Sequence, residues 1–369
     1  MKKTFIVTWS LVALILFNVA AVQAAEWGLK EGSLKLQSAG PLAFGPDGIL
    51  FVGDTTAAAV VAIETGDASG DPSSARFSVD GLRASVAKLL GSNAKSTKIN
   101  DLAVNPLSGN VYLSVTKSDS TPALLRIDAK GKLSELSLKK VMFSIVALPN
   151  APENKETGKG RRRRNRRAES ITDIAYVDGK VLVSGLSGSP APSTVREIAF
   201  PFVSADGGVN VEIYHAAHGR SENYSVVRTF VPFVIDGKPH LLAGFTCTPL
   251  VKFPLGAIAS DAKVLRGTTV AELGNRNRPL DMIAYSKKGK SYLLMANSAR
   301  GVMKISTQGI ERKEGITKRV PGGGTAGQKF ETIKQLKGVV QLDRLNDKYA
   351  VILVQADGGS QNLRTIELP

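Results

Sequence analysis

The chain has little cysteine, histidine and tryptophan. Its 369 residues include one cysteine, Cys247, three histidines and two tryptophans. A single cysteine excludes an internal disulfide bond, and it also excludes the Cys-x-x-Cys-His motif that attaches c-type haem. We therefore expect no covalent haem. The scarcity of tryptophan argues against repeats built around that residue, such as WD-type repeats.

Long apolar runs are also missing, except at the beginning of the chain. Lys2 and Lys3 precede an apolar run over residues 5–22, and small residues follow it. This pattern is typical of a secretory signal peptide over residues 1–24, which would make the mature protein periplasmic or secreted. An uncleaved membrane anchor is the alternative, because the run is of marginal spanning length.

Positive charge is concentrated in one segment. The formal net charge is +16, and residues 159–167, KGRRRRNRR, carry seven positive charges. We expect a disordered basic loop at about residues 150–170, able to attract an anionic surface. No aromatic residue interrupts the run, so we do not expect sequence-specific nucleic-acid binding. The arginines concerned are Arg161, Arg162, Arg163, Arg164, Arg166 and Arg167.

Short strands that alternate with glycine turns fill the remainder of the sequence. In residues 278–306, LDMIAY, SYLLMAN and RGVMKIS have the composition of strands, and KKGK between the first two has that of a hairpin turn. Similar units begin near residues 40, 99, 171, 226, 278 and 337. Residues 240–254 align with residues 292–306 without a gap. The pattern therefore indicates a repeat of one small all-β unit.

This recurrence predicts an all-β fold, a β-propeller with six blades in a single domain over residues 25–369. Residues 67–98 interrupt the repeat and contain one short helix near residues 81–90; a seventh blade could lie there. A pair of β-sandwiches is the alternative fold. The lone strand pattern near residues 27–37 would pair with the other end of the chain, as is common in propellers.

The DGxxφφ hairpins and the strands INDLAV, ITDIAY and PLDMIA, where φ is an apolar residue, resemble those of NHL and YVTN-type propellers. More loosely, they resemble the six-bladed gluconolactonase-like enzymes. The resemblance covers nearly all of the mature chain and lies in the repeat, not in a catalytic motif. It implies the fold and export, and it implies no substrate.

One face of such a propeller gathers the unusual residues. We call it the top face: the end where each innermost strand begins and where the loops between second and third strands lie. The first hairpin of each unit is a plain turn at the opposite, bottom face. Binding sites are commonly built from loops on a rigid scaffold, so the top mouth of the channel is the predicted site. The residues expected to bind a ligand there are Asp101, Asp173, Arg220, Glu222, Arg278, Asp281, Asn297 and Arg300.

The three aspartates recur at one position of their units. They suit Ca²⁺ or another divalent cation, since such ions prefer oxygen ligands. The alternative is structural: their carboxylates would bond neighbouring backbone amides. Blades two, three and five are not all adjacent in a ring that follows chain order, which weakens the expected convergence.

His215, His218 and Cys247 form a second candidate metal site on the top face. The spacing His-x-x-His puts both rings on one side only if the loop turns helically. Loop polar groups that bond backbone are the alternative for the histidines, and a small buried residue is the alternative for Cys247. His240 matches Tyr292 at the bottom face, which argues against a site of three histidines.

Two functions follow from these features. The first is an exported, monomeric propeller that binds a small molecule or a protein partner through its top-face loops; it is supported by the lack of a recognisable catalytic motif. The second is a metal-dependent hydrolase of lactonase type, with a cation at the channel mouth polarising a carbonyl. A copper or redox role for the histidine and cysteine residues is a third hypothesis.

Overall fold

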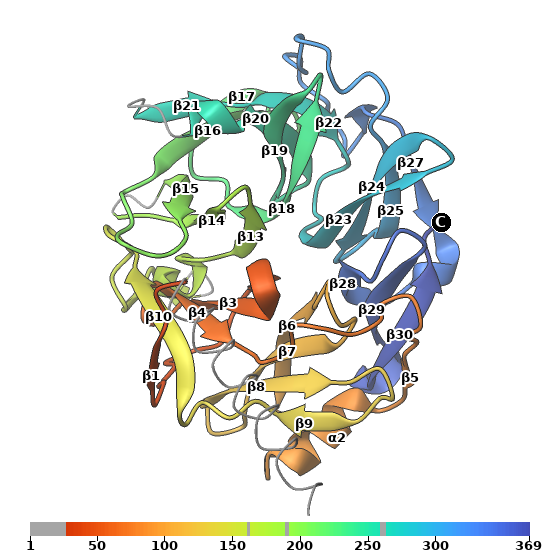
Figure 1. Cartoon of the computed structure of the whole chain (residues 1–369). Helices are drawn as coiled ribbons and strands as arrows, with labels where there is room; N and C mark the ends of the chain where they lie inside the picture. The colour runs from red at the N-terminus through yellow and green to blue at the C-terminus, as the bar shows by residue number, and fades with distance from the viewer. Residues whose placement is uncertain (1–26, 161–162, 189–191, 259–262) are drawn as a thin grey trace, which may run out of the picture.

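The chain forms a ring of β-sheets around a central channel (Figure 1). The computed structural model describes residues 27–160, 163–188, 192–258 and 263–369. The predicted signal peptide, Arg161 and Arg162 therefore lie outside the described residues. Within the described part, no helix is both long enough and apolar enough to cross a bilayer.

Six antiparallel sheets make six blades, which confirms the predicted fold class and blade number. From the channel outward, blade 1 consists of β2 (Leu42–Phe44), β3 (Ile49–Asp54), β4 (Ala59–Glu64), β10 (Val141–Ala147) and β1 (Lys30–Gly32). Blade 2 consists of β6 (Lys98–Val104), β7 (Val111–Thr116), β8 (Pro122–Ile127) and β9 (Leu133–Glu135). Blade 3 consists of β13 (Asp173–Val177), β14 (Lys180–Leu186), β15 (Ser193–Ala199) and β16 (Val209–His215), with β17 (Arg220–Glu222) and β21 (Val264–Arg266) beside β16.

The other three blades follow the same plan. Blade 4 consists of β18 (Val227–Ile235), β19 (Lys238–Phe245), β20 (Pro249–Pro254), β22 (Thr268–Glu272) and β26 (Ala326–Gly327). Blade 5 consists of β23 (Pro279–Lys287), β24 (Lys290–Asn297), β25 (Gly301–Ser306) and β27 (Phe330–Ile333). Blade 6 consists of β28 (Val339–Arg344), β29 (Tyr349–Gln355), β30 (Gln361–Glu367) and β5 (Ser78–Val79).

The bottom hairpins use the turn chemistry expected from the sequence. Four of them have two successive residues at positive φ. In blades 3, 4 and 5 the pair forms a two-residue hairpin and matches its twist. These pairs are Asp178–Gly179, Asp236–Gly237 and Lys288–Gly289. In blade 1 the pair is Asp47–Gly48, within the longer turn that contains η1 (Pro46–Gly48).

The blades do not follow one another around the ring in chain order. Blade 2 packs between blades 1 and 6, and blade 3 packs on the other side of blade 1. The order around the ring is therefore 2, 1, 3, 4, 5, 6 (Figure 1). Each of the six interfaces holds its own apolar core, so that every sheet is covered on both faces. Burial at these interfaces supplies the main driving force of the fold.

Two outer strands depend on this path of the chain. After blade 2, the chain returns to add β10 to blade 1, and β1 then pairs with β10. The expectation that the first strand pairs with the other end of the chain is therefore wrong. Instead, β5 from residues 67–98 completes blade 6 by pairing with β30. The same segment holds α2 (Leu82–Leu89), as predicted, and no seventh blade.

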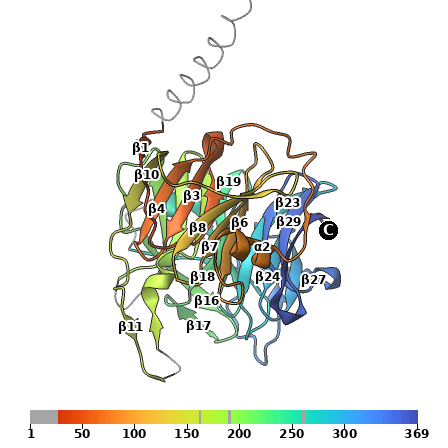
Figure 2. The ribbon, with the colours of Figure 1, turned by 90° about the horizontal axis from the view of Figure 1, so that it is seen from below.

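The predicted basic loop contains local structure in its described part. Strands β11 (Glu156–Thr157) and β12 (Arg164–Asn165) pair with each other, and η3 (Arg166–Glu169) follows. The hairpin lies at the top face, which points downward in Figure 2. Asn165 caps η3 by accepting a hydrogen bond from the backbone of Arg167.

The ring order can be tested by a double-mutant cycle between blades 2 and 6. Leu113 and Leu353 are fully buried in one core cluster. Each change to Ala should destabilise the protein by about 2–5 kcal/mol. Because the two sites share an interface, the double variant should depart from additivity by about 0.5–3 kcal/mol in urea denaturation.

The matched control combines Leu113→Ala with Leu241→Ala, which lies in the core between blades 3 and 4. These two changes should add within about 0.5 kcal/mol. Additivity of the first pair would contradict the ring order.

Candidate functional site

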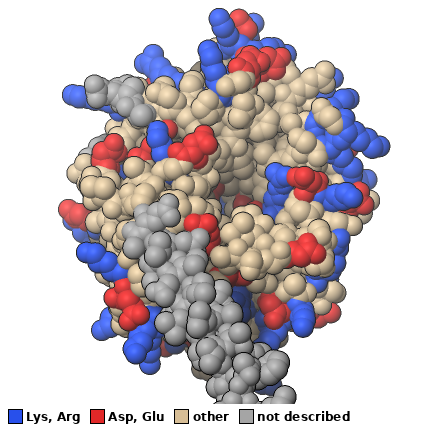
Figure 3. Space-filling view, in the orientation of Figure 1, with Lys and Arg blue, Asp and Glu red and all other residues tan. Residues whose placement is uncertain are grey.

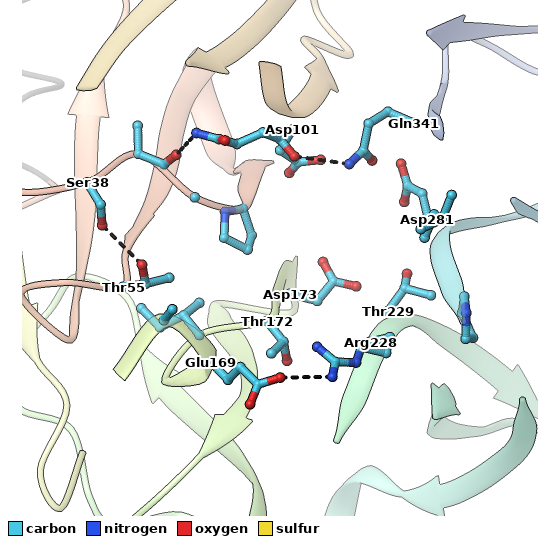
Figure 4. A pocket seen from close by; sticks show the side chains of 18 of the residues that line it. Ser38, Thr55, Asp101, Glu169, Thr172, Asp173, Arg228, Thr229, Asp281 and Gln341 are labelled. Atoms are coloured by element: carbon cyan, nitrogen blue, oxygen red, sulfur yellow. Dashed lines mark hydrogen bonds and ion pairs between the residues drawn. The ribbon is translucent and has the colours of Figure 1, made fainter. Parts of the chain in front are cut away.

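Three aspartates converge at the waist of the channel. Asp101, Asp173 and Asp281 occupy the same position of the innermost strands of blades 2, 3 and 5. In the observed ring order, these blades alternate with blades 1, 4 and 6, so the three carboxyl groups surround the axis (Figure 4). The expectation that the spacing of these blades weakens convergence is therefore wrong.

Each aspartate joins two neighbouring blades. Oδ1 of Asp173 accepts a hydrogen bond from its own strand at Ile174 N, at 2.8 Å, and Oδ2 accepts one from Phe230 N of blade 4, at 2.7 Å. The equivalent bonds between blades run to Asp101 from Leu42 N, at 2.7 Å, and to Asp281 from Leu342 N, at 2.8 Å. These contacts fit the structural alternative for the aspartates. They leave further lone pairs on each carboxyl group, which has about four acceptor positions.

Sequence reasoning missed two residues at the same level of the channel. Thr229 of blade 4 and Gln341 of blade 6 occupy the position that holds aspartate in the alternate blades. Oγ1 of Thr229 and Oε1 of Gln341 are both buried and have no hydrogen-bond partner among the described residues. Aligning units four and six on the aspartates would have found them. The third residue without a carboxylate at this position, Pro41 of blade 1, offers no side-chain donor or acceptor.

Burial dominates the electrostatics of the waist. It raises the pKa of Asp173 to about 7, although the hydrogen bonds from Phe230 N and Ile174 N lower this pKa. Burial also raises the pKa of Asp101 and of Asp281 well above the ordinary value, and repulsion by the other carboxylates adds to this. At a lower level, Asp343 accepts from Val104 N at 2.7 Å, and burial raises its pKa to about 6. Such a cluster favours a bound proton or cation.

The channel opens into a cavity on each side of this waist. The top cavity has a volume of about 380 Å³ and the bottom one of about 880 Å³, and the three aspartates line both. Figure 3 shows the bottom face, with the hollow at its centre. The top cavity is the smaller of the two.

Basic groups lie at the rim of the top cavity. Arg228 pairs with Glu169 of η3 at 2.8 Å and donates to Thr246 Oγ1 at 2.9 Å (Figure 4). Arg278 is exposed at the same mouth, as predicted, and forms no ion pair with any residue that the structure describes. The pair of Arg228 and Glu169 had no signal in the sequence, because it joins η3, which precedes blade 3, to β18 of blade 4.

The histidine and cysteine residues form a separate cluster on the top face. One ring nitrogen each of His215 and His218 and the sulfur of Cys247 lie within 4.8 Å of one another. Arg220 and Glu222, predicted to bind a ligand at the mouth, belong to this cluster instead. His240 lies apart from this cluster, as the repeat alignment predicts. Its Nδ1 contacts Lys238 O.

Two other predicted residues do not line the top cavity. Asn297, the last residue of β24, is buried; it accepts a hydrogen bond from Asn277 Nδ2 and donates one to Met295 O. Arg300 is exposed and reaches Asn275 O at 3.3 Å. Both side chains therefore lie away from the cavity that the three aspartates line.

Among the described arginines of the basic segment, Arg163 and Arg164 are exposed, and Arg166 and Arg167 are half-buried in η3. Arg163 forms an ion pair with Glu156 across the β11–β12 hairpin. Because η3 carries Glu169 to the rim, the basic hairpin is attached directly to the mouth of the channel. Its interaction with an anionic partner stays a prediction.

Comparison with known proteins gives similarity of fold alone. No family model and no curated protein matches the chain. Among solved structures, a provisionally assigned 6-phosphogluconolactonase of Bacteroides uniformis is 14% identical, with 92% of this chain and 79% of that chain covered and a TM-score of 0.37. A thermostable family-43 glycoside hydrolase is 12% identical, with 74% and 90% covered and a TM-score of 0.40. A PQQ-bound aldose sugar dehydrogenase of Streptomyces coelicolor is 12% identical, with 92% and 97% covered and a TM-score of 0.29.

The raised pKa of Asp173 predicts that acid stabilises the protein. Between the ordinary value of 3.8 and about 7, the folded state holds a proton that the unfolded state has lost. Stability should therefore fall as the pH rises through this window, by up to about 1.4 kcal/mol per pH unit for one such group. Asp173→Asn removes this titration, so its stability should vary less with pH in urea denaturation from about pH 5 to 7.

Asp119→Asn serves as the control, because Asp119 is exposed on a loop of blade 2. Its curve should run parallel to that of the unchanged protein. If the Asp173→Asn curve is parallel too, the aspartate is ionised throughout this range and the argument from burial is wrong.

Proposed function

We propose that the protein is an exported, monomeric propeller that binds a small polar ligand in the top mouth of its channel. The observation that carries this proposal is the convergence of three half-buried carboxyl groups on one cavity of about 380 Å³. A pocket of this volume suits a small molecule. Export rests on the signal-peptide pattern of residues 1–24.

The arrangement of charge indicates the orientation of the ligand. The floor of the cavity is acidic, whereas Arg228 and Arg278 lie at the rim. None of the described residues that line this cavity is aromatic, so the proposed binding relies on polar contacts and not on stacking. The proposed ligand is rich in hydroxyl groups, with any carboxylate near the arginines, and a divalent cation can neutralise the floor. The basic hairpin beside the mouth would attract an anionic ligand through long-range charge.

A metal-dependent hydrolase of lactonase type is the second candidate function. It is favoured by the oxygen atoms at the waist: three carboxyl groups and the unpartnered Oε1 of Gln341. Oxygen ligands of this kind fit Ca²⁺ or another hard divalent cation. Because every aspartate already accepts bonds from backbone amides, a cation there would keep positions for water or a carbonyl oxygen of a substrate. At such an open position, the cation would act as the Lewis acid that polarises the carbonyl group of a lactone.

Calcium binding to the mature protein, purified without a histidine tag, tests the acidic floor. One equivalent of Ca²⁺ should bind in calorimetry and raise the melting temperature, by an amount that corresponds to about 2.7 kcal/mol at a hundredfold excess over Kd. Asp281→Asn should weaken binding at least about tenfold, since fewer charged ligands remain. Asp343→Asn is the matched control: it also removes a carboxylate that joins two blades, but Asp343 does not line the top cavity.

The second step adds gluconate, as a hydroxyl-rich acid, and a sugar lactone to the calcium-loaded protein. Binding of either without turnover supports the binding function, and proton release from the lactone that Asp281→Asn abolishes supports the hydrolase. If neither Ca²⁺ nor gluconate changes the melting temperature, the channel mouth is not the proposed site.

A further inference from the structure

A second site lies away from the channel, where blades 3 and 4 meet on the top face. His215 ends β16, His218 follows in the next turn, and Cys247 lies in the loop between β19 and β20. One ligand atom from each lies within 4.8 Å of the other two. Two different blades therefore contribute to a single cluster of imidazole and thiol groups.

The local backbone explains how both histidines reach the same side. The amides of His218 and Gly219 both donate to His215 O, at 3.1 and 2.8 Å. These bonds close one helical turn after the strand, which is the condition under which His-x-x-His puts its rings together. The ring centroids are 3.9 Å apart.

Glu222 fixes the orientation of both rings. Its Oε2 lies 2.9 Å from Nδ1 of His215, and its Oε1 lies 2.6 Å from Nδ1 of His218. Ser225 Oγ also donates to Oε2 of Glu222, at 2.6 Å. Because the carboxylate oxygens accept from each Nδ1, each Nε2 keeps its lone pair.

One of these Nε2 atoms is buried without a partner. His215 is 1% exposed, and its Nε2 forms no hydrogen bond with any described residue. A buried nitrogen without a partner destabilises the unliganded protein. A carboxylate behind Nδ1 with a free Nε2 in front is the arrangement that holds metal-binding histidines in place.

The loop that carries Cys247 is conformationally unusual. Cys247 and Thr248 have φ values of 66° and 63°, a region that non-glycine residues seldom adopt. Hydrogen bonds from Cys247 N to Asn277 O and from Thr248 Oγ1 to Gly274 O hold this turn, at 2.9 and 2.6 Å. Strain of this kind concentrates at functional sites. Here it presents the only thiol of the chain to the two histidines.

We propose that His215, His218 and Cys247 bind one transition-metal ion of the zinc and copper class. Imidazole and thiolate ligands select these ions, whereas Ca²⁺ and Mg²⁺ prefer oxygen. Three protein ligands leave a fourth position, and the partial exposure of His218 and Cys247 lets solvent reach it. Buried Glu272 accepts from Ala217 N at 3.1 Å, and its unpartnered Oε1 offers a further acceptor in the same region.

The test uses the full mature protein without a histidine tag, stripped by a chelator and then titrated separately with Zn²⁺, Co²⁺ and Cu²⁺. We expect one equivalent bound and a charge-transfer band from the thiolate with Co²⁺ or Cu²⁺. Competition between Zn²⁺ and Cu²⁺ identifies the preferred ion. Cys247→Ser should remove the band, and His218→Ala should weaken binding at least about tenfold.

His240→Ala is the matched control, because His240 lies outside the cluster and near the bottom face. It should bind metal as the unchanged protein does. Absence of the thiolate band, or metal uptake that Cys247→Ser does not alter, would overturn the proposal. The proposal is also overturned if iodoacetamide alkylates Cys247 rapidly and bound metal does not slow this reaction. Such reactivity would indicate that Cys247 is a nucleophile paired with His218. Calcium binding at the channel is measured independently, so the two proposals can fail separately.

Discussion

Backbone amides that face the channel must find acceptors outside their own sheet. The innermost strand of each blade has a neighbour on one side only, and its other edge is turned toward the axis. A buried amide without a partner is destabilising, which native structures rarely allow. In this protein Asp101, Asp173 and Asp281 accept these bonds across blade boundaries. The closure of the ring and the acidic waist of the channel therefore have one cause.

The structural and binding roles of the aspartates are compatible for the same reason. Each carboxyl group uses some of its lone pairs on amides, and this fixes its position relative to the axis. A cation or ligand would then meet oxygen atoms that are already oriented, which lowers the cost of binding. In the unliganded protein this arrangement is unfavourable for the ionised carboxylates, because burial and mutual repulsion raise the pKa values of the three groups.

Local features of the fold could be predicted from the sequence, and long-range ones could not. Hairpins such as Asp178–Gly179 depend on neighbouring residues, so blade number followed from their recurrence. Ring order depends on which sheets pack together, and the recurrence of a unit along the chain does not show this. The aspartates were found because one residue type recurs. Gln341 was missed because a different type fills the same position, and the contact of Arg228 with Glu169 joins a strand of blade 4 to η3, far away in the sequence. The cluster of His215, His218 and Cys247 was predicted from the shared face, whereas the orienting role of Glu222 required the geometry.

The outer strand of blade 6 has a consequence for biogenesis. Phe77 N bonds Thr365 Oγ1, a contact between residues 288 positions apart. When β5 has emerged, it has no sheet to join, because its partner β30 is synthesised much later. The ring can therefore close only after blade 6 has been synthesised, and a chain terminated before β30 keeps unpaired strand edges that favour aggregation. If the protein is exported, as we propose, this delay keeps the chain unfolded while it is carried across a membrane.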